Sequence, residues 1–291
     1  MSNWNLLIKR GEALLSRLEQ VLPAAPVATD WKSIAFRWRK RNGHGTLEAV
    51  SHVHRISLND LCGIDGQKKI VEQNTRQFVD GHPANNVLLT GARGTGKSSL
   101  IKALLNKYAP RGLRVIEVEK QDLIDLPDMV ELIARRPEKF LLYCDDLSFE
   151  ADEPGYKALK VVLDGSVAAA SENCLIYATS NRRHLMPEFM SENLEAKRVD
   201  DEIHPGETVE EKISLSERFG VWVSFYPFDQ DEYLDIVAQW LAHFKVAGAK
   251  SESVRQAALQ WALQRGSRSG RVAWQFARDW AGRARAVRAR T

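Results

Sequence analysis

The sequence has little cysteine and no long hydrophobic run. Its three cysteines, Cys62, Cys144 and Cys174, are odd in number, far apart and set in apolar surroundings. This pattern excludes a disulfide scaffold and a zinc-type ligand cluster, and it predicts buried free thiols. The longest apolar stretches are strand-sized, which excludes a membrane span. Charges throughout the first twenty residues exclude a secretory signal peptide, so a cytoplasmic location is expected.

The chain also lacks a strong charge of either sign. Its 291 residues carry a net charge of only +3, too little to argue for a nucleic-acid partner without regard to its distribution. Apolar residues make up 44% and charged residues 27%, both typical of globular proteins. Because internal repeats and low-complexity tracts are absent, the length indicates one large domain, or one domain and a smaller one.

The first 57 residues predict a separate N-terminal region. Leucines at helical spacing over residues 2–22 predict a helix that ends before Pro23. This helix is either an arm for a partner or packed back on the main domain. Residues 31–41, WKSIAFRWRKR, interleave basic and aromatic side chains. They form either a strand with one solvated face or a contact for nucleic acid.

Residues 58–228 alternate between apolar strands and amphipathic helices, which predicts a parallel α/β sheet flanked by helices. The expected strands cover 87–91, 114–119, 139–146, 173–181 and 222–228. Residues 229–291 are predicted to form a small helical lid of three helices. The first lid helix begins at a capping box of Asp229 and Glu232.

The segment GARGTGKS lies between the first expected strand and a helix, and it fits the phosphate-binding pattern GxxxxGK[ST]. Its glycines let backbone N–H groups point at phosphate oxygens. Lys97 is expected to reach the β- and γ-phosphates, and the Ser98 hydroxyl to ligate Mg²⁺. The predicted ligands are therefore ATP or ADP with Mg²⁺. The candidate nucleotide contacts here are Gly91, Ala92, Arg93, Gly94, Thr95, Gly96, Lys97, Ser98 and Ser99.

Polar side chains end the next strands at the same edge of the sheet. Asp145 follows the strand FLLYC and is the predicted magnesium ligand, and Asp146 is the candidate to polarise the attacking water. The pair could instead cap the following helix. One strand later, the polar residues Thr179, Ser180 and Asn181 end YATSN. The Asn181 amide could hydrogen-bond the γ-phosphate or the water.

Two arginines are candidates for contacts with phosphate charge. Arg218 precedes the fifth strand and could point at a neighbouring subunit's nucleotide. The alternative is an ion pair within the chain, with Glu210, Glu211 or Glu217. Arg271 opens the last helix and could fold back over the phosphates, with Arg268 as the competing choice.

These elements, in this order and followed by a helical lid, resemble the AAA+ ATPases from Leu58 to Arg290. The resemblance makes residues 91–98 the Walker A motif and Asp145 with Asp146 the Walker B motif. It makes Asn181 sensor 1, Arg218 the arginine finger and Arg271 sensor 2. The segment LNDLCGIDGQKK resembles the one that holds adenine in these proteins. The implied base contacts are Cys62, Gly63 and Ile64.

More narrowly, four segments resemble the bacterial AAA+ ATP-binding family labelled domain of unknown function 815. They are NNVLLTGARGTGKSSLIKALL, CDDLSFE, IYATSNRRHL and LSERFGVWVSFYPFDQDEYL. The SERFG element also resembles the corresponding element of bacterial replication initiators. The resemblance implies a homo-oligomeric ring or filament in the ATP state, with a hexamer expected and sites shared between subunits. It leaves a protein client to be identified.

Two features depart from the AAA+ pattern. Asp146 stands where glutamate is usual, so hydrolysis is expected to be slow, or Glu150 assists. The segment KQDLIDLPDM lacks the aromatic–apolar–glycine triplet of peptide-threading rings, which argues against an unfoldase. The competing functions are a P-loop small-molecule kinase and a DNA-associated ATPase of the initiator or loader kind. A kinase leaves Arg218, Asn181 and the lid unexplained.

Two further segments carry expectations about partners. The terminal ARDWAGRARAVRAR is rich in arginine, so it predicts either weak, salt-sensitive, nonspecific DNA binding or a solvated helix face. The polar stretch from Glu192 to Glu211 is predicted to be a long loop that orders at the subunit interface.

Overall fold

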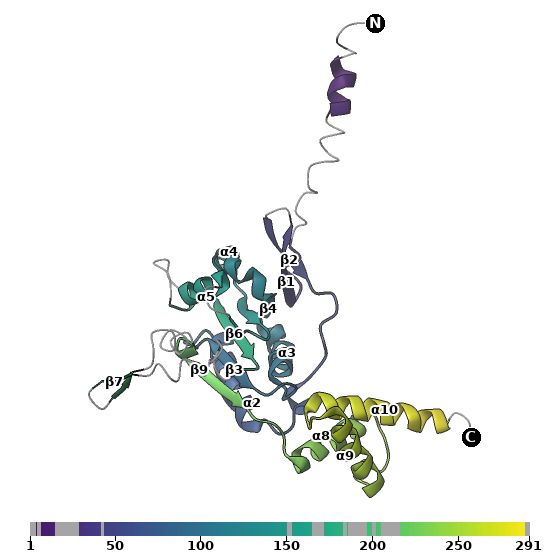
Figure 1. Cartoon of the computed structure of the whole chain (residues 1–291). Coiled ribbons are helices and arrows are strands. Elements are labelled where there is room, and N and C mark those ends of the chain that lie inside the picture. Colours follow the sequence, from purple (N-terminus) through teal and green to yellow (C-terminus); the bar gives the residue numbers. More distant parts are fainter. Residues whose placement is uncertain are drawn as a thin grey trace.

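The computed structural model describes residues 4, 7–14, 29–41, 44–149, 153–164, 172–182, 185, 197–199, 202–204 and 216–288. A seven-stranded sheet forms its centre (Figure 1). The strand order is β2-β1-β4-β5-β6-β3-β9. β1 and β2 pair antiparallel, and every other pairing is parallel. The bounds are β1 Ala35–Arg41, β2 His44–Ala49, β3 Val87–Gly91, β4 Leu113–Val118, β5 Lys139–Cys144, β6 Cys174–Ser180 and β9 Val221–Phe225.

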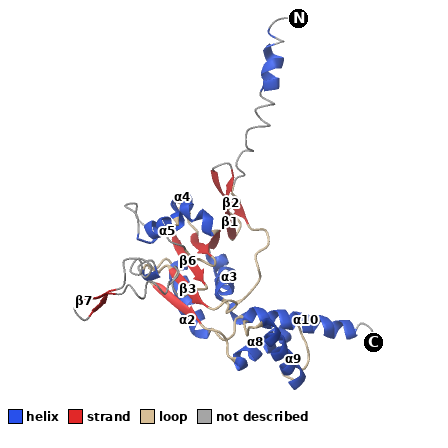
Figure 2. Ribbon diagram, viewed as in Figure 1, coloured by secondary structure: helices blue, strands red, loops and turns tan. Residues whose placement is uncertain are grey.

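Helices cover both faces of this sheet (Figure 2). α2 (Asp65–Val79) and α3 (Lys97–Tyr108) pack on one face, and α4 (Leu126–Ile133) and α5 (Pro154–Asp164) on the other. In β5, Leu141 and Tyr143 turn to the α3 side while Leu142 turns to the α4 side. Both sides of the strand are buried, which is why it reads as a continuous apolar run. Short 3₁₀ turns, η1 (Leu58–Asp60), η2 (Ala109–Arg111) and η3 (Lys120–Asp125), complete this part.

Three helices after β9 form the lid: α8 Gln230–His243, α9 Glu252–Arg265 and α10 Gly270–Arg288. The predicted capping box is confirmed, because the backbone N–H of Glu232 donates to Asp229 at 2.8 Å and the reciprocal bond is 2.9 Å. The Tyr233 hydroxyl donates to the carbonyl of Ala258 at 3.1 Å and joins α8 to α9. The predicted fold class, a mostly parallel sheet flanked by helices and followed by a helical lid, is confirmed.

The sheet extends past the boundary predicted at residue 58, because the β1–β2 hairpin adds to it beside β4. Phe36 and Trp38 are buried, so the strand interpretation of residues 31–41 is the correct one. The basic side chains of β1 pair with acids of the same chain. Arg37 lies 2.9 Å from Glu117, Arg39 lies 2.6 Å from Glu119, and Lys40 lies 2.8 Å from Asp125.

Several other predictions fall partly outside the described residues. Residues 7–14 are helical, with Leu7, Ile8 and Leu14 exposed. Inside the stretch predicted to be a loop, β7 (Lys197–Val199) and β8 (Glu202–His204) pair as a short hairpin. The rest of that stretch, Glu150 and the side chains of the last basic residues lie outside the described part. α10 carries an ion pair of 2.8 Å between Arg283 and Asp279.

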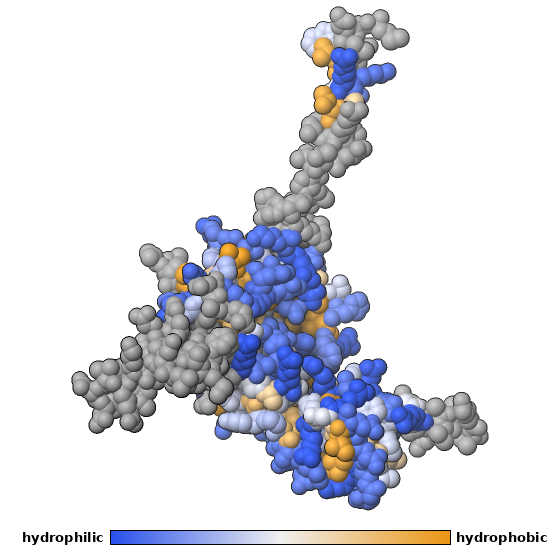
Figure 3. Space-filling model, viewed as in Figure 1, coloured by the Kyte–Doolittle hydropathy of each residue, from blue (hydrophilic) through white to orange (hydrophobic). Residues whose placement is uncertain are grey.

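The three cysteines are free, as predicted, but only Cys144 is fully buried; Cys62 and Cys174 are partly exposed. Among the helices that the structure describes, none has the length and hydropathy needed to cross a membrane. The face turned to the viewer in Figure 3 is mostly hydrophilic over its described part.

Candidate functional site

The glycine loop joins β3 to α3 at the carboxyl edge of the sheet. Gly91 has a φ of +121°, and a Cβ there would lie 1.9 Å from the carbonyl oxygen of Phe225 in β9. Only glycine fits so close to the neighbouring strand. The Thr95 hydroxyl donates to the carbonyl of Ala92 at 2.8 Å and closes the loop from inside. The N-terminus of α3 then faces the concave side of this loop, as a phosphate-binding loop requires.

The Lys97 amino group occupies the centre of the loop. It donates to the carbonyls of Gly91 (2.7 Å) and Ala92 (2.8 Å) and to Oδ1 of Asn181 (3.1 Å). Burial lowers the pKa of Lys97 from its usual value, although the nearby charges of Asp145 and Asp146 oppose this. A buried lysine that contacts backbone carbonyls but no carboxylate has unused capacity to pair with an anion.

Asp145 gathers hydroxyl groups from two elements. Oδ1 of Asp145 accepts from the Ser98 hydroxyl of α3 at 2.8 Å and from the Thr179 hydroxyl of β6 at 2.6 Å. Burial alone would raise the pKa of Asp145, but the nearby hydroxyl groups of Thr179, Tyr143 and Ser98 outweigh it, so the pKa is lowered. The carboxylate is therefore charged at neutral pH, and a carboxylate beside a hydroxyl suits Mg²⁺.

Asp146 leaves the strand in an unusual backbone conformation. Its φ is +51°, in the left-handed region that aspartate tolerates better than most residues. This turns the side chain toward the loop, where it accepts from the Asn181 amide and lies 3.8 Å from Arg93. Its backbone N–H donates to the Thr179 hydroxyl at 2.9 Å. Asp146 and Asn181 thus lie together at the edge of the site.

The lid contacts the loop directly. The backbone N–H of Gly270, at the start of α10, donates to the carbonyl of Gly94 at 2.9 Å. A Cβ on Gly94 would lie 2.8 Å from Ser269, so the two backbones approach as closely as glycine permits. Arg271 therefore sits beside the loop and lines the cleft, whereas Arg268 does not line it.

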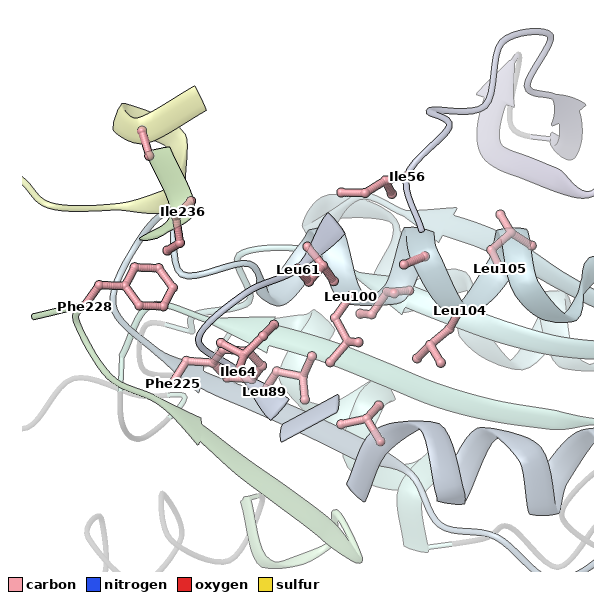
Figure 4. Close-up of a cluster of buried hydrophobic side chains, with 14 of the residues drawn as sticks. Ile56, Leu61, Ile64, Leu89, Leu100, Leu104, Leu105, Phe225, Phe228 and Ile236 are labelled. Carbon is pink, nitrogen blue, oxygen red and sulfur yellow. The ribbon is translucent and has the colours of Figure 1, made fainter. Parts of the chain in front are cut away.

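Apolar side chains form another part of the cleft wall. Ile236 of α8 and Phe228 lie across from Leu61 and Ile64 (Figure 4). Cys62 also lines the cleft and donates to the Gln239 side chain of α8. Gly63 lies behind it, against the Phe228 ring. The segment predicted to hold a base is thus fastened to the lid.

Together these parts enclose a cleft of about 630 Å³. One end is polar and charged, and the other is apolar, which suits a ligand with a phosphate end and an aromatic end. Most of the predicted site residues meet here. Those that line it are Cys62, Ile64, Arg93, Gly94, Thr95, Gly96, Lys97, Ser98, Ser99, Asp145, Asp146, Asn181 and Arg271.

Residues 31–284 match the family described as "Protein of unknown function (DUF815)". The chain belongs to this family. The matched range begins just before β1, so the hairpin is part of the family's domain. No curated protein matches the chain.

Solved structures with similar folds share little sequence with this DUF815 protein. A mutant of Thermotoga maritima RuvB is 16% identical with a TM-score of 0.48, over 76% of this chain and 64% of that one. The replication initiator DnaA bound to AMPPCP and single-stranded DNA is 17% identical with a TM-score of 0.47, over 72% and 60%. A chain of the E. coli MS115-1 HORMA:CdnC:Trip13 complex is 11% identical with a TM-score of 0.47, over 76% of this chain and 90% of that one. The chain thus spans less than two thirds of the RuvB and DnaA chains, and at these identities the likeness does not bear on activity.

Arg218 lies outside the cleft of this DUF815 protein. Val221, three residues later, pairs with Val87 at the start of β3, while the glycine loop follows the other end of that strand. Arg218 therefore lies at the amino edge of the sheet, far from its own loop. It forms an ion pair with Asp164 at the end of α5, and not with Glu217. Glu210 and Glu211 lie outside the described residues.

Thr179 is the site residue whose role sequence reasoning missed. It bonds to the Asp145 carboxylate and to the backbone of Asp146, and its own carbonyl accepts from the N–H of Leu147 at 2.7 Å. The only signal available was its position at a strand end. The decisive fact is the pairing of β5 with β6, in which Cys144 lies opposite Ala178.

Proposed function

We propose that this protein binds Mg-ATP in the cleft and hydrolyses it at a site completed by a neighbouring subunit. The subunits that share these sites form an assembly, which remodels or regulates a macromolecular partner. The observation that carries it is the convergence of Lys97, Ser98 and Asp145 at the mouth of the glycine loop. Magnesium and phosphate need this combination of cation, hydroxyl and carboxylate.

Each residue has a part in the proposed reaction. The loop N–H groups and Lys97 bind the phosphates, and Lys97 exchanges the Gly91 and Ala92 carbonyls for phosphate oxygens. The Ser98 hydroxyl and the Asp145 carboxylate hold Mg²⁺, which when bound neutralises charge on the β- and γ-phosphates. Asp146 accepts a proton from the attacking water. The Asn181 amide orients both the Asp146 carboxylate and this water. Cys62, Ile64 and the apolar wall hold adenine, and Arg271 contacts phosphate from the lid.

Arg218 supports the shared-site part of the proposal by its position. It cannot reach the glycine loop of its own chain, so any contact with a γ-phosphate is made in a neighbour. The proposed assembly is a homo-oligomeric ring or filament. In such assemblies an arginine from the neighbour can raise turnover about a thousandfold.

A complementation experiment tests this proposal. Arg218→Ala keeps the ATP cleft but lacks the finger, and Lys97→Met keeps the finger but lacks the phosphate contact. Each variant alone is expected to have little turnover, and a mixture of the two is expected to regain part of it, measured as phosphate release against total protein concentration. Light scattering with and without ATP reports assembly.

Asp164→Asn is the matched control, because it breaks the same ion pair but leaves Arg218 in place. It is expected to retain turnover. The shared site would be contradicted if the mixture released no phosphate beyond the sum of its parts and Arg218→Ala alone kept full turnover as a monomer. That result would favour a small-molecule kinase.

A further inference from the structure

Two tyrosines lie side by side in the sheet, beneath α3. Tyr143 of β5 and Tyr177 of β6 are register partners, and both belong to the core on the α3 side. Both are buried, with 3% and 0% of their surface exposed. Their hydroxyl groups differ in one respect, which is whether they have a hydrogen-bond partner.

The Tyr177 hydroxyl is satisfied by α2. It accepts from the Asn74 amide at 3.0 Å and lies 2.9 Å from the Thr75 hydroxyl. Both partners are buried, and neither lines the cleft. Tyr177 therefore has a structural role, joining the sheet to α2.

The Tyr143 hydroxyl makes no well-aligned hydrogen bond to any described residue, although it is buried. A buried polar group without a partner is unfavourable, so native proteins rarely leave one without a reason. Tyr143 lies two residues before Asp145 and faces α3, the helix whose Ser98 bonds to Asp145. Thr179 of the neighbouring strand β6 bonds to the same carboxylate.

Among these neighbours, the Asp145 carboxylate is the charged acceptor for the Tyr143 proton. The donors that already bond to it, Ser98 and Thr179, use the same oxygen, Oδ1. The Ser98 hydroxyl and the Asp145 carboxylate would together hold Mg²⁺, which when bound would supply positive charge beside the phosphates. A third donor on Asp145 would then fix its orientation, as hydrogen bonds to metal-ligating carboxylates do.

We infer that Tyr143 is a positioning residue for magnesium, whose hydroxyl donates to the Asp145 carboxylate when Mg-ATP is bound. The partner missing from the ligand-free protein is supplied by the bound state. Part of the free energy of Mg-ATP binding thus comes from giving the Tyr143 hydroxyl the hydrogen bond that it lacks in the folded protein without ligand. This inference rests on the proposed function, because it requires Mg-ATP in the cleft.

Tyr143→Phe tests the inference, since phenylalanine keeps the ring and removes only the hydroxyl. The readouts on the full-length chain are the unfolding temperature without ligand and the Mg²⁺ concentration at which ATP raises it half-maximally. The expected results are an unfolding temperature unchanged or higher without ligand, and a Mg²⁺ requirement raised about tenfold.

Tyr177→Phe is the matched control, with the opposite expectation. This variant loses the hydrogen bonds to Asn74 and Thr75, so its unfolding temperature falls. Its Mg²⁺ requirement stays that of the wild type. An unchanged Mg²⁺ requirement in Tyr143→Phe would overturn the inference, whatever its stability. A wild type that shows no Mg-dependent response to ATP would instead overturn the proposed function.

Discussion

Lys97 stabilises the glycine loop with contacts that a ligand can replace. The residue is only 6% exposed, and its amino group donates to two carbonyls that phosphate oxygens can displace. The lowered pKa reflects the cost of burying this charge without a carboxylate partner. Phosphate would supply that missing negative charge.

Lys97→Met is therefore expected to abolish the rise in unfolding temperature that Mg-ATP causes, while leaving the ligand-free protein at least as stable. The reason is that methionine fills the volume without a buried charge. Thermal unfolding with and without Mg-ATP measures both effects. Lys102→Met, an exposed lining residue further along α3, is the control and is expected to keep most of the shift. Equal loss in both variants would contradict a special role for Lys97.

Site residues that belong to a local sequence motif were predictable. Contacts between residues far apart in the sequence were not. The glycine loop, Ser98 and the two acids follow from a motif and a strand end. Asp146 in place of glutamate has a structural reason that the sequence hides, because its left-handed backbone suits aspartate. The Arg218 partner, Asp164, lies 54 positions away in sequence, so only the folded chain brings it close.

At the scale of elements, the lid and the loop are joined through Gly94 and Gly270. Their backbone bond and the Ser269 contact leave no room for a Cβ on Gly94, whose φ is +76°. A closed arrangement of the lid over the loop depends on this approach.

Gly94→Ala is expected to cost about 1–2 kcal/mol through its left-handed backbone, and more through the Ser269 clash. Adding Ser269→Gly should relieve only the clash and recover about 0.5–1 kcal/mol as a coupling energy. Denaturant unfolding of both single variants and the double variant measures this. Strictly additive effects would show that the lid does not rest on the loop.

The central strands were predictable because they are short apolar runs, but β2 and α2 were missed, as was the short β7–β8 hairpin. β2 reads HGTLEA and has mostly polar residues, as an outer edge strand does. α2 has few apolar residues in its fifteen, and two of its four buried positions are the polar Asn74 and Thr75, so its apolar pattern is sparse. Its role is nevertheless central, since Val71 and Phe78 pack beneath β3.

The hairpin is fastened to η3 through Asp125, which accepts from the Trp38 ring N–H at 3.0 Å and from Lys40 at 2.8 Å. Burial would raise the pKa of Asp125, but these two bonds outweigh it, so the pKa is lowered. A lowered pKa means that the contribution to stability is complete above the unfolded value of about 3.9 and is lost as pH falls through the folded value.

Asp125→Asn is accordingly expected to lower the free energy of unfolding at pH 7 by about 1–2 kcal/mol. The difference from the wild type should shrink below about pH 4. Denaturant unfolding over the acid-to-neutral range measures this. A difference that stays constant over that range would contradict the role of the charge.

At the scale of the whole molecule, pairing within the chain decides what its basic residues can bind. Arg37 and Arg39 looked like phosphate contacts in the sequence, but each is paired with a glutamate of the next strand or the residue after it. A phosphate would have to compete with these carboxylates for the guanidinium groups. Nucleic-acid binding through the hairpin is therefore disfavoured.

The double variant Arg37→Gln, Arg39→Gln is expected to change affinity for random-sequence DNA by less than about twofold. Binding of the wild type is expected to be weak and to fall steeply between about 50 and 200 mM salt. Fluorescence anisotropy with a labelled duplex measures both. A loss of about tenfold in the double variant would instead place a phosphate contact on the hairpin.

The position of the hairpin has a consequence for how the protein can be modified. β2 is the outermost strand on one side, and five strand spacings, about 24 Å, separate it from the strand that carries the glycine loop. The chain enters the fold at this remote border. The point at which residue 31 joins the fold is thus separated from the cleft by most of the width of the sheet. New modules or reporters can be grafted there while the chemistry at the other side stays untouched.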